Sequence, residues 1–302
     1  MKNPIFEELI KLKLISKLNL ITLSNTTRDK KIKVIKDLKT KIIFLEKYIT
    51  NNEYYSSLKY NDDGRKVFDK SKKKIANVKT TYKKIKTPLT KKDNRRAVQF
   101  EKNLKNKDIL DFGCGWGGFL RNVKNYKSLS GVELRKECIN YIHKNIKKID
   151  VSHNLNSFDK KFDIITMFHV LEHIPYQIKT LKLLKSKLKN KGKIIIEVPH
   201  AEDFLILQEE LKEFKNFTFW SEHLILHTYK SLKFILLKSG FKNINILYYQ
   251  RYNFSNHLGW FLKKKPGGHD FYKEIISDSL NSSYCENLKK LGQTDTLIAI
   301  AK

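Results

Sequence analysis

The stretch that decides the fold reads ILDFGCGWGGFL and spans residues 109–120. A short apolar run ends at Asp111, four glycines follow between Gly113 and Gly118, and helix-forming residues then resume. This order predicts a strand, a tight turn and a helix. Glycines suit such a turn because a side chain there would hold a ligand away from the backbone. The stretch therefore predicts a loop that cradles a nucleotide.

An acidic residue follows this loop at the distance that ribose binding requires. A second predicted strand covers residues 128–133, and its last residue, Glu133, lies 18 positions after Gly115. A carboxylate at this offset can accept hydrogen bonds from both hydroxyls of a ribose. The loop and Glu133 together indicate a nucleoside as part of the ligand.

The loop itself distinguishes between two kinds of ligand. Gly113, Gly115 and Gly118 alone match the dinucleotide fingerprint, which is a weak signal by itself. Asp111 and the additional Gly117 favour S-adenosylmethionine. The methionine ammonium group of that molecule requires a carboxylate and carbonyl groups, whereas a dinucleotide requires a pyrophosphate site.

The chain after residue 100 alternates between predicted strands and helices, which is the pattern of a doubly wound, mostly parallel sheet. The last two strands are joined by an insertion without a regular crossover helix, which predicts an antiparallel edge. The predicted helices are 117–126, 135–146, 176–188 (ended by Asn190-Lys191-Gly192) and 230–239 (ended by Gly240). The seven predicted strands are 109–112, 129–134, 148–152, 162–168, 193–199, 241–249 and 295–301.

Residues 1–53 form a different kind of structure, because eleven of the twelve glycines lie at or after Gly113. We expect a helical extension with one helix over residues 4–23 and a second helix after it. In the second helix apolar residues recur at spacings of 3 and 4 and form one seam. The seam residues are Ile35, Leu38, Ile42, Leu45 and Ile49. Packing of this seam on the first helix is the preferred interpretation, and a homodimer contact through residues 31–50 is the alternative.

The remaining boundaries follow from composition. Residues 54–100 are rich in lysine and are interpreted as a basic helical cap or linker, with a partly mobile segment as a close alternative. This segment contains five aromatic residues, Tyr54, Tyr55, Tyr60, Phe68 and Tyr82. The domain that binds the nucleoside is assigned to residues 101–302, with helical insertions at about 200–229 and 251–293.

The charge of the chain does not by itself identify a partner. The formal net charge is +30 and the pI is about 9.8, but only seven of the 61 basic residues are arginine. Arginine is the residue that reads phosphate in a bidentate manner, so a solvated lysine surface is the preferred interpretation. An anionic small substrate or a membrane surface comes next, and nucleic acid is the least favoured partner.

Cysteine content and hydropathy indicate the compartment in which the protein is expected. Its three cysteines, Cys114, Cys138 and Cys285, share no metal-binding spacing and suggest no disulfide framework, which fits a reducing cytoplasm. The apolar start of the chain is interrupted by lysines, so it is not interpreted as a signal peptide. No run reaches the roughly 18 apolar residues that a membrane span needs.

A second motif places the chain in a family. Residues 162–174 read FDIITMFHVLEHI and resemble the fourth-strand motif of the class I S-adenosylmethionine-dependent methyltransferases. With the glycine loop and Glu133, the resemblance covers about residues 100–250 and implies the Rossmann-like methyltransferase fold and S-adenosyl-L-methionine as cofactor. It implies that Phe168 and His169 line the methionine end. The cofactor-binding residues assigned in this way are Asp111, Phe112, Gly113, Cys114, Gly115, Gly117, Glu133, Leu134, Asn154, Leu155, Phe168 and His169.

The same motif also matches a metal-binding pattern. His169, Glu172 and His173 have the spacing of the inverse zinc-peptidase signature, in which two histidines one helical turn apart bind metal. Such a site needs a third protein ligand and a well-formed helix. Because the motif follows a strand directly and Pro175 comes two residues later, we expect no metal site, and we assign Glu172 and His173 to fixing the turn.

The segment FWSEHL, residues 219–224, is similar to a Glu-His pair of sugar C-methyltransferases, in which such a histidine has been assigned as general base. The resemblance makes His223 the candidate base, Glu222 its orienting partner and His169 a further catalytic candidate. The alternative is that this pair anchors the inserted segment. The chain lacks the cysteine-rich N-terminus of that sugar family. This difference argues against methylation at carbon more than it argues against a sugar substrate.

The insertion 251–293 resembles a segment of methyltransferases encoded with bacterial surface-polysaccharide genes. There Trp260 could stack on a sugar, and Arg251 or Lys265 could meet a phosphate, or Trp260 could be part of a buried turn. The resemblance implies a methyltransferase that acts on a small molecule, a sugar or a nucleotide-linked sugar of polysaccharide biosynthesis. The alternatives are an RNA methyltransferase that uses the basic N-terminal region, a methyltransferase of another small metabolite, and a cofactor-binding protein without catalysis.

Overall fold

Seven strands form the largest sheet of the protein. The computed structural model describes residues 3–49, 66–69, 74–77, 91–272 and 274–302. The strand order is β12-β13-β10-β9-β6-β7-β8. The bounds are β6 Asp108–Phe112, β7 Ser128–Val132, β8 Ile149–Ser152, β9 Phe162–Phe168, β10 Leu188–Pro199, β12 Asn245–Tyr249 and β13 Thr296–Ala301. The predicted fold class, a mostly parallel seven-stranded sheet flanked by helices, is confirmed.

The last strand of the chain runs against its neighbours. β13 pairs antiparallel with β10 on one side, where Ile195 faces Ile300, and with β12 on the other, where Leu247 faces Ile298. The antiparallel strand therefore lies inside the sheet and β12 forms the edge. Because β10 and β13 are covered on both faces, their residues form nearly continuous apolar runs, as in Ile194–Ile196.

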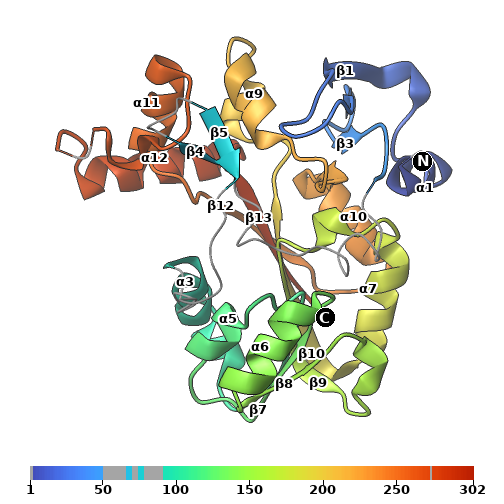
Figure 1. Cartoon of the computed structure of the whole chain (residues 1–302). Coiled ribbons are helices and arrows are strands. Elements are labelled where there is room, and N and C mark those ends of the chain that lie inside the picture. Colours follow the sequence, from blue (N-terminus) through green and yellow to red (C-terminus); the bar gives the residue numbers. More distant parts are fainter. Residues whose placement is uncertain (1–2, 50–65, 70–73, 78–90, 273) are drawn as a thin grey trace. The chain divides into compact units, whose positions relative to one another are not determined.

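The chain divides into two compact units, which we describe one at a time. The first unit consists of residues 51–164. Its strands β6, β7 and β8 are parallel, with Ile109 opposite Leu129 and Leu129 opposite Ile149. Figure 1 shows α5 and α6 alongside these strands. The helices of this unit are α3 Lys91–Gln99, α4 Glu101–Leu104, α5 Gly118–Asn122 and α6 Lys136–Asn145.

The basic segment before α3 differs from its prediction where it can be described. Residues Lys66–Asp69 and Lys74–Asn77 form strands β4 and β5, an antiparallel hairpin in place of the expected short helices. Phe68 and Ile75 are register partners in this hairpin, so β-forming residues decide the local structure. The predictions for Tyr54, Tyr55, Tyr60 and Tyr82 lie outside the described residues.

The second unit consists of residues 1–50 and 165–302. Helices α7 and α10 pack on each other, and both predicted insertions contain helices. The bounds are α7 Gln177–Ser186, α8 Phe204–Leu207, α9 Lys212–Thr218, α10 Tyr229–Lys238, α11 Phe254–Lys263 and α12 Asp278–Leu291. The predicted stop of α10 at Gly240 is confirmed, and this glycine has a φ of 87°.

The predicted end of α7 is wrong. We expected Asn190-Lys191-Gly192 to end this helix, but α7 ends at Ser186 and those residues belong to β10. The backbone N–H of Lys187 already donates to the carbonyls of Leu184 and Lys185, which closes the last turn. The strand then begins at the buried Leu188.

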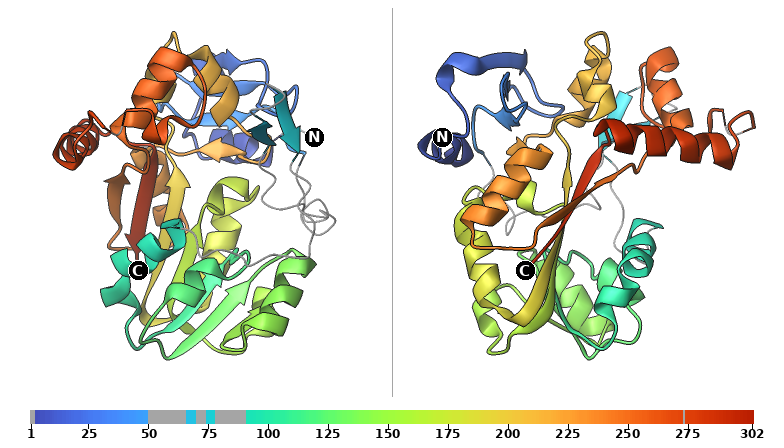
Figure 2. Two further views of the ribbon diagram at one scale, coloured as in Figure 1. Left: turned by 60° about the vertical axis from the view of Figure 1, so that its left-hand side comes forward. Right: turned by 180° about the vertical axis from the view of Figure 1, so that it is seen from behind.

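The N-terminal extension is a helix followed by a sheet, not two helices. α1 spans only Pro4–Lys11, and the next elements are β1, β2 and β3. Together with β11, which comes from the first insertion, they form a sheet in the order β1-β2-β3-β11. Figure 2 shows the blue strands of this segment from two sides. Their bounds are β1 Leu20–Ser24, β2 Val34–Asp37, β3 Ile43–Leu45 and β11 Ile225–Leu226.

The predicted apolar seam therefore does not form a helix: Ile35 and Leu45 lie in strands, and the helical basis for a dimer contact through residues 31–50 is lost. The segment is rich in β-branched residues, which favour extended backbone. A turn separates β2 from β3: the carboxylate of Asp37 accepts hydrogen bonds from the backbone N–H groups of Lys39 and Thr40. Lys41 then adopts a left-handed φ of 62°, which reverses the chain. A helix through this turn would lose these contacts.

Candidate functional site

The glycine loop follows β6 in the first unit and is tied to the end of β7. The backbone N–H groups of Gly113 and Cys114 both donate to the carbonyl of Val132, at 2.8 and 3.0 Å. Gly115 and Gly117 adopt left-handed φ values of 54° and 74°, a conformation that side chains disfavour. The loop is therefore the tight strand-to-helix turn that its glycines predict.

Glu133 directs its carboxylate at this loop. One carboxylate oxygen accepts the backbone N–H of Gly115 at 2.8 Å, and the other accepts the backbone N–H of Arg135 at 3.0 Å. The guanidinium of Arg135 bonds both oxygens, at 3.1 and 3.2 Å. Glu133 is thus a fixed acceptor beside the loop, and Arg135 is a partner that the sequence pattern did not reveal.

The predicted cofactor residues of the first unit gather around the same edge of the sheet, whereas Phe168 and His169 belong to the second unit. Since β6, β7 and β8 are parallel, the segments that follow them lie at adjacent strand ends. Leu134 is exposed and Leu155 is buried, while the side chain of Asn154 accepts the backbone N–H of Asn156 and caps a short 3₁₀ turn. Residues of this edge are Asp111, Phe112, Gly113, Cys114, Gly115, Gly117, Glu133, Leu134, Asn154 and Leu155.

Two further contacts shape the loop. A Cβ at Gly118 would lie 2.4 Å from a carboxylate oxygen of Asp93 in α3, so only glycine fits beneath this side chain. A Cβ at Gly131 would lie 2.6 Å from the sulfur of Cys114. Burial raises the pKa of the Cys114 thiol well above its ordinary value, so Cys114 packs as a neutral side chain. Asp93 was missed because nothing in its own sequence context indicates that α3 covers the loop.

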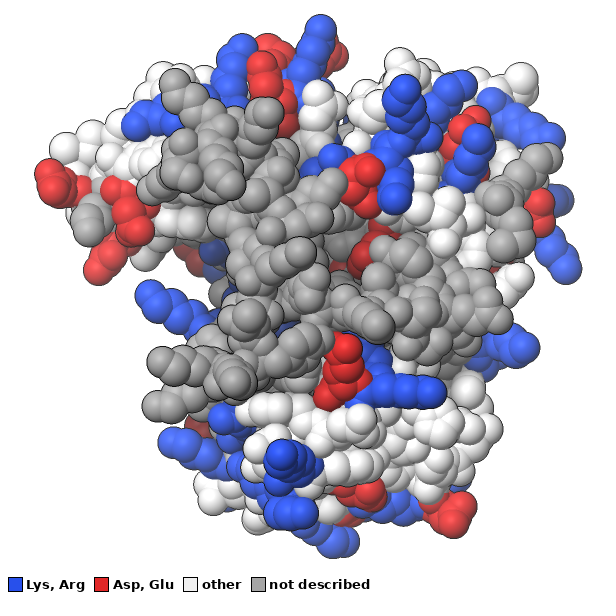
Figure 3. Space-filling view, in the orientation of Figure 1, with Lys and Arg blue, Asp and Glu red and all other residues white. Residues whose placement is uncertain are grey.

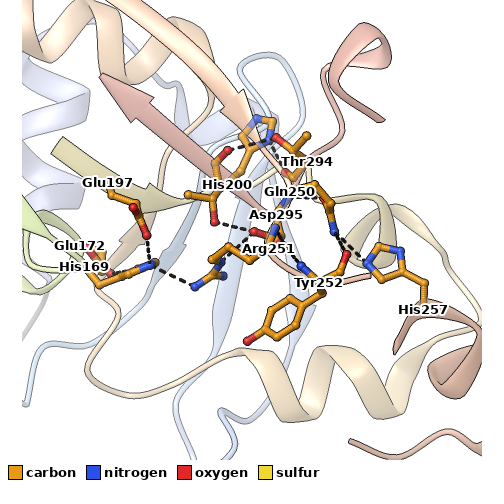
Figure 4. Close-up of polar contacts among 11 residues, drawn as sticks. His169, Glu172, Glu197, His200, Gln250, Arg251, Tyr252, His257, Thr294 and Asp295 are labelled. Atoms are coloured by element: carbon orange, nitrogen blue, oxygen red, sulfur yellow. Dashed lines mark hydrogen bonds and ion pairs between the residues drawn. The ribbon is translucent and has the colours of Figure 1, made fainter. Parts of the chain in front are cut away.

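The second unit holds a network of charged side chains, which we call the histidine–carboxylate cluster (Figure 4). The Nδ1 atom of His169 lies 3.2 Å from the carboxylate of Glu172, and its Nε2 atom lies 3.1 Å from that of Glu197. A guanidinium nitrogen of Arg251 lies 3.0 Å from the same Nε2 atom. Asp295 accepts the Nε–H of Arg251 at 2.8 Å and completes the cluster.

His169 is strained and partly exposed. It has a φ of 56°, which a side chain other than glycine rarely adopts, and its backbone N–H donates to the carbonyl of Glu197 at 2.8 Å. Strain of this kind is often found at functional sites. The His169 side chain is 23% exposed, whereas those of Glu172 and Glu197 are fully buried. Access to the cluster therefore runs through His169 and, at 17% exposure, Arg251.

The ion pair between Arg251 and Asp295 holds the end of β12 to the start of β13. The second carboxylate oxygen of Asp295 accepts the backbone N–H groups of Arg251 and Tyr252. Burial alone would raise the pKa of Asp295, but Arg251 and the hydrogen bonds hold it below its ordinary value. The nearby carboxyl of Asp203 behaves differently, because burial and the charge of Asp295 raise its pKa to about 7. Glu197 and Asp295 were not predicted as site residues.

The structure brings His223 close to residues from an earlier part of the chain, and its pairing with Glu222 stays a prediction. The ring of His223 packs edge-on against that of His173, with centroids 4.9 Å apart, and Glu172 supplies the nearby carboxylate. Burial and the neighbouring His173 lower the pKa of His223 to about 3. Adjacent side chains of a non-helical segment generally point in different directions, so a Glu-His dipeptide is a weak predictor of a pair.

The segment around His223 also anchors the N-terminal extension. The backbone N–H of Arg28 donates to the carbonyl of Phe219 at 2.7 Å, and the hydroxyl of Ser221 donates to the carboxylate of Asp29 at 2.6 Å. The guanidinium of Arg28 lies over the ring of Trp220. These contacts come from Phe219, Trp220 and Ser221, and the alternative that Glu222 and His223 anchor the inserted segment stays a prediction.

Trp260 does not form a platform for a sugar. Its ring is only 3% exposed and packs between Phe214 and Phe217, with centroids 5.0 and 5.1 Å away. The interpretation of Trp260 as a sugar-stacking residue is wrong. Trp260 is buried, as the alternative expected, but it lies in helix α11 rather than in a turn. Lys265 is exposed just beyond the end of the same helix.

One face of the molecule shows both signs of charge. On the face drawn in Figure 3, acidic residues lie among the lysines and arginines of the described residues. None of the described helices is long and apolar enough to cross a membrane.

Two buried histidines should make the fold sensitive to acid. His257 accepts a hydrogen bond at Nε2 from the side-chain amide of Gln250 and lies 2.6 Å from the hydroxyl of Tyr284 through Nδ1. If Nε2 were protonated, its N–H would face the N–H of the Gln250 amide and the hydrogen bond would be lost. Burial lowers the pKa of His257 to about 4. Burial likewise lowers the pKa of His227 to about 4. Between pH 6.5 and pH 4 these two histidines are protonated in the unfolded chain but remain neutral in the folded protein. Each histidine therefore lowers the free energy of unfolding as the pH falls through this range.

We expect His257→Gln to destabilise the protein at pH 7 and to lose most of that deficit, on the order of 2 kcal/mol, by pH 4.5. Urea unfolding at the two pH values measures the gap to the wild type. The exposed His153 provides a control, since His153→Gln should show a gap that does not change with pH. A constant gap for His257→Gln would contradict the assignment of a buried neutral imidazole.

Comparisons with known proteins show which family this chain resembles. A family model described as a methyltransferase domain matches residues 87–246, more than half of the chain. The chain is 32% identical over 159 residues to the tRNA U34 carboxymethyltransferase of Nautilia profundicola, which covers 48% of this chain and 51% of the relative. It is 27% identical over 109 residues to the ubiquinone biosynthesis O-methyltransferase of Coxiella burnetii, covering 33% and 46%.

The chain spans about half the length of the curated relatives it matches. Among solved structures, a SAM-dependent methyltransferase from Archaeoglobus fulgidus is 24% identical with a TM-score of 0.44. That match covers 69% of this chain and 90% of the other.

Proposed function

This chain belongs to the class I methyltransferases, whose methyl donor is S-adenosylmethionine, and from that premise we propose that it methylates a small polar molecule, a sugar or a nucleotide-linked sugar. The observation on which the donor side of this proposal rests is the hydrogen bond between the backbone of Gly115 and the carboxylate of Glu133. It fixes an acidic group beside a glycine, which has no side chain to hold a ligand away from the backbone.

The residues of the first unit fit the donor. A Cβ at Gly115 would lie 3.3 Å from a guanidinium nitrogen of Arg135, so the loop keeps its bare surface only with glycine. Glu133 would accept the ribose hydroxyls, and Leu134, Asn154 and Leu155 would hold the adenine end. When bound, S-adenosylmethionine supplies an electrophilic methyl group. The loop and Glu133 bind and orient it.

The histidine–carboxylate cluster supports a polar acceptor. Arg251 uses Nε and one terminal nitrogen for Asp295 and His169, and its other terminal nitrogen has no partner among the described residues. This donor and the exposed part of His169 could bond a phosphate or hydroxyl group of the acceptor. A nucleotide-linked sugar offers both kinds of group. We retain His169 as a residue that touches the acceptor, with Glu172 in place of Glu222 as the carboxylate that orients a histidine.

A second candidate substrate is tRNA. The relative from Nautilia profundicola is named for a tRNA modification, and this chain has a net charge of +30. A lysine-rich surface binds phosphate chains with an affinity that falls steeply with salt. Only seven of the 61 basic residues are arginine, the residue that reads phosphate in a bidentate manner, which favours the small molecule. The two substrates can be separated by experiment.

Calorimetry and labelling test the proposal together. We expect titration with S-adenosylmethionine or its demethylated product to show one binding site per chain and titration with NAD to show none. With S-adenosylmethionine labelled in its methyl group, we expect label in the small-molecule fraction of a cell extract and not in total tRNA. Binding of NAD in place of S-adenosylmethionine would refute the donor. Label in tRNA that disappears at high salt would establish the second candidate instead.

A further inference from the structure

We propose that Glu172, His173 and His223 form a binding site for a zinc ion. One potential ligand atom from each of these residues lies within 4.8 Å of the other two, and this is the one such group of three among the residues that the structure describes. Glu172 and His173 come from the short 3₁₀ turn Leu171–His173 after β9, and His223 comes from the segment after α9. The site goes beyond the proposed methyl transfer and does not depend on it.

Glu172 is the strongest indication that something binds here. Its side chain is fully buried, and one oxygen is engaged with Nδ1 of His169 at 3.2 Å. Its other oxygen, Oε2, has no hydrogen-bond partner among the described residues although it is buried. Leaving a buried carboxylate oxygen unpaired is costly, and most such groups in folded proteins are paired. A cation would satisfy it.

The backbone holds the three ligands together. The N–H of Leu224 donates to the carbonyl of Glu172 at 2.8 Å and fastens the segment with His223 to the 3₁₀ turn. The N–H of His173 donates to the carbonyl of Val170, which closes that turn. Because the main chain is fixed at both ligand segments, only side-chain rotation is needed to bring the ligand atoms together.

The distances are close to those of a metal site. The Nε2 atom of His173 lies 3.9 Å from Oε1 of Glu172, the oxygen that also contacts His169, so a cation here would be bound by both oxygens of this carboxylate. Ligand atoms about 2.1 Å from a tetrahedral zinc lie roughly 3.4 Å apart, so this pair needs to close by about half an ångström. The rings of His173 and His223 meet at 81°, which lets a nitrogen of each point toward one position.

The chemistry of the donors selects zinc. Two imidazoles and one carboxylate form the His₂Glu set of catalytic zinc sites, in which three protein ligands leave the fourth position open. Calcium and magnesium prefer sites made of oxygen ligands alone. The contact of His169 with Glu172 has the form of an outer partner that orients a metal-binding carboxylate. The open fourth position would take water or an oxygen atom of a ligand.

This proposal revises two expectations from the sequence. The zinc-peptidase pattern used His169 and His173 as ligands and lacked a third, and on that basis no metal was expected. In the structure His169 contacts Glu197 and Arg251, and His223, fifty residues after His173, supplies the missing ligand. A nitrogen that binds metal cannot also accept a proton, so His223 becomes a ligand rather than the general base.

Metal analysis of the purified, untagged chain tests the site. After equilibration with zinc sulfate and gel filtration, we expect about one zinc per chain by elemental analysis. His223→Ala and His173→Ala should each weaken zinc binding by at least about 100-fold, more than the loss of an outer partner costs. Competition with a fluorescent zinc chelator measures the change. The exposed His153, changed to alanine, should leave zinc content and affinity unaltered.

A second measurement separates loss of a ligand from loss of the fold. Binding of S-adenosylmethionine, which uses the glycine loop and Glu133, should stay within about threefold of wild type in each histidine variant that is correctly folded. Absence of retained zinc in the wild-type chain would overturn the proposal, as would equal zinc affinity in His223→Ala and wild type. Either result would leave the methyltransferase assignment untouched, because the donor measurement does not involve the metal.

Discussion

The substitution Gly115→Val should reduce the affinity for S-adenosylmethionine by at least about 100-fold. Gly115 has a φ of 54°, and a β-branched side chain in this left-handed region strains the backbone. The new Cβ would also lie 3.3 Å from a guanidinium nitrogen of Arg135 and displace it from Glu133. The turn and the carboxylate that binds ribose would be disturbed together.

Calorimetric titration measures this loss, and Gly267→Val is the matched control. Gly267 also has a left-handed φ, of 95°, but no atom lies within 4 Å of the position that its Cβ would take. Both variants therefore suffer backbone strain, and only Gly115→Val fills the loop. Wild-type affinity in Gly115→Val would mean that the donor binds elsewhere in the chain. Equal losses in both variants would mean that general destabilisation causes the effect.

The substitution Asp295→Ala should lower the free energy of unfolding by about 3 to 5 kcal/mol. The Asp295 carboxylate is 2% exposed and bonds the Arg251 guanidinium at 2.8 Å, so its removal leaves a buried cation without its main partner. The backbone N–H groups of Arg251 and Tyr252 would lose their acceptor as well. Most of the loss in the free energy of unfolding comes from leaving these groups unpaired, and less comes from the net contribution of the ion pair.

Urea unfolding of Asp295→Ala gives the size of this penalty. Glu286→Ala serves for comparison, because Glu286 also forms an ion pair, with Lys289, but its side chain is 58% exposed. An exposed pair contributes at most about 1 kcal/mol, so this variant should unfold almost like wild type. Similar small losses in both variants would show that the pair between Arg251 and Asp295 is not buried in solution.

The central sheet could be predicted because its strands have strong local signals. The buried run Phe162–Phe168 becomes β9 with the predicted bounds, and the loop from Gly113 to Gly118 forms the predicted turn. A parallel strand covered on both faces must be apolar along its whole length, and a turn that binds a ligand closely must lack side chains. Both requirements act on consecutive residues, so they can be recognised in the sequence.

The extension was mispredicted because its pattern fits two periods. Apolar residues from Ile35 to Ile49 recur at intervals of 3 and 4, but the segment also contains the short apolar run Ile43–Leu45, which forms a buried strand. The turn at Asp37 and Lys41 decides between a helix and a pair of strands. Because aspartate and lysine do not reliably end a helix, this turn could not be recognised in the sequence. Spacing alone could not distinguish them.

The candidate site was only partly predictable, since its residues meet across long stretches of chain. His169 was found because it follows a strong strand. Its partners Glu197 and Arg251 come from other elements, and so does Asp295 beyond them. Glu133 was found from its offset to the loop, whereas Arg135 was missed because no pattern links its guanidinium to that carboxylate.

The pairing of β3 with β11 affects how the protein is made. Phe44 and Ile225 are register partners although 181 residues separate them (225 − 44 = 181). A ribosome that adds about 5 to 20 residues per second needs roughly 10 to 40 seconds to make the intervening chain. During that interval the hairpin of β2 and β3 has an open edge that another nascent chain could occupy. The late arrival of β11 therefore leaves the edge of β3 unprotected during synthesis unless a chaperone or another segment covers it.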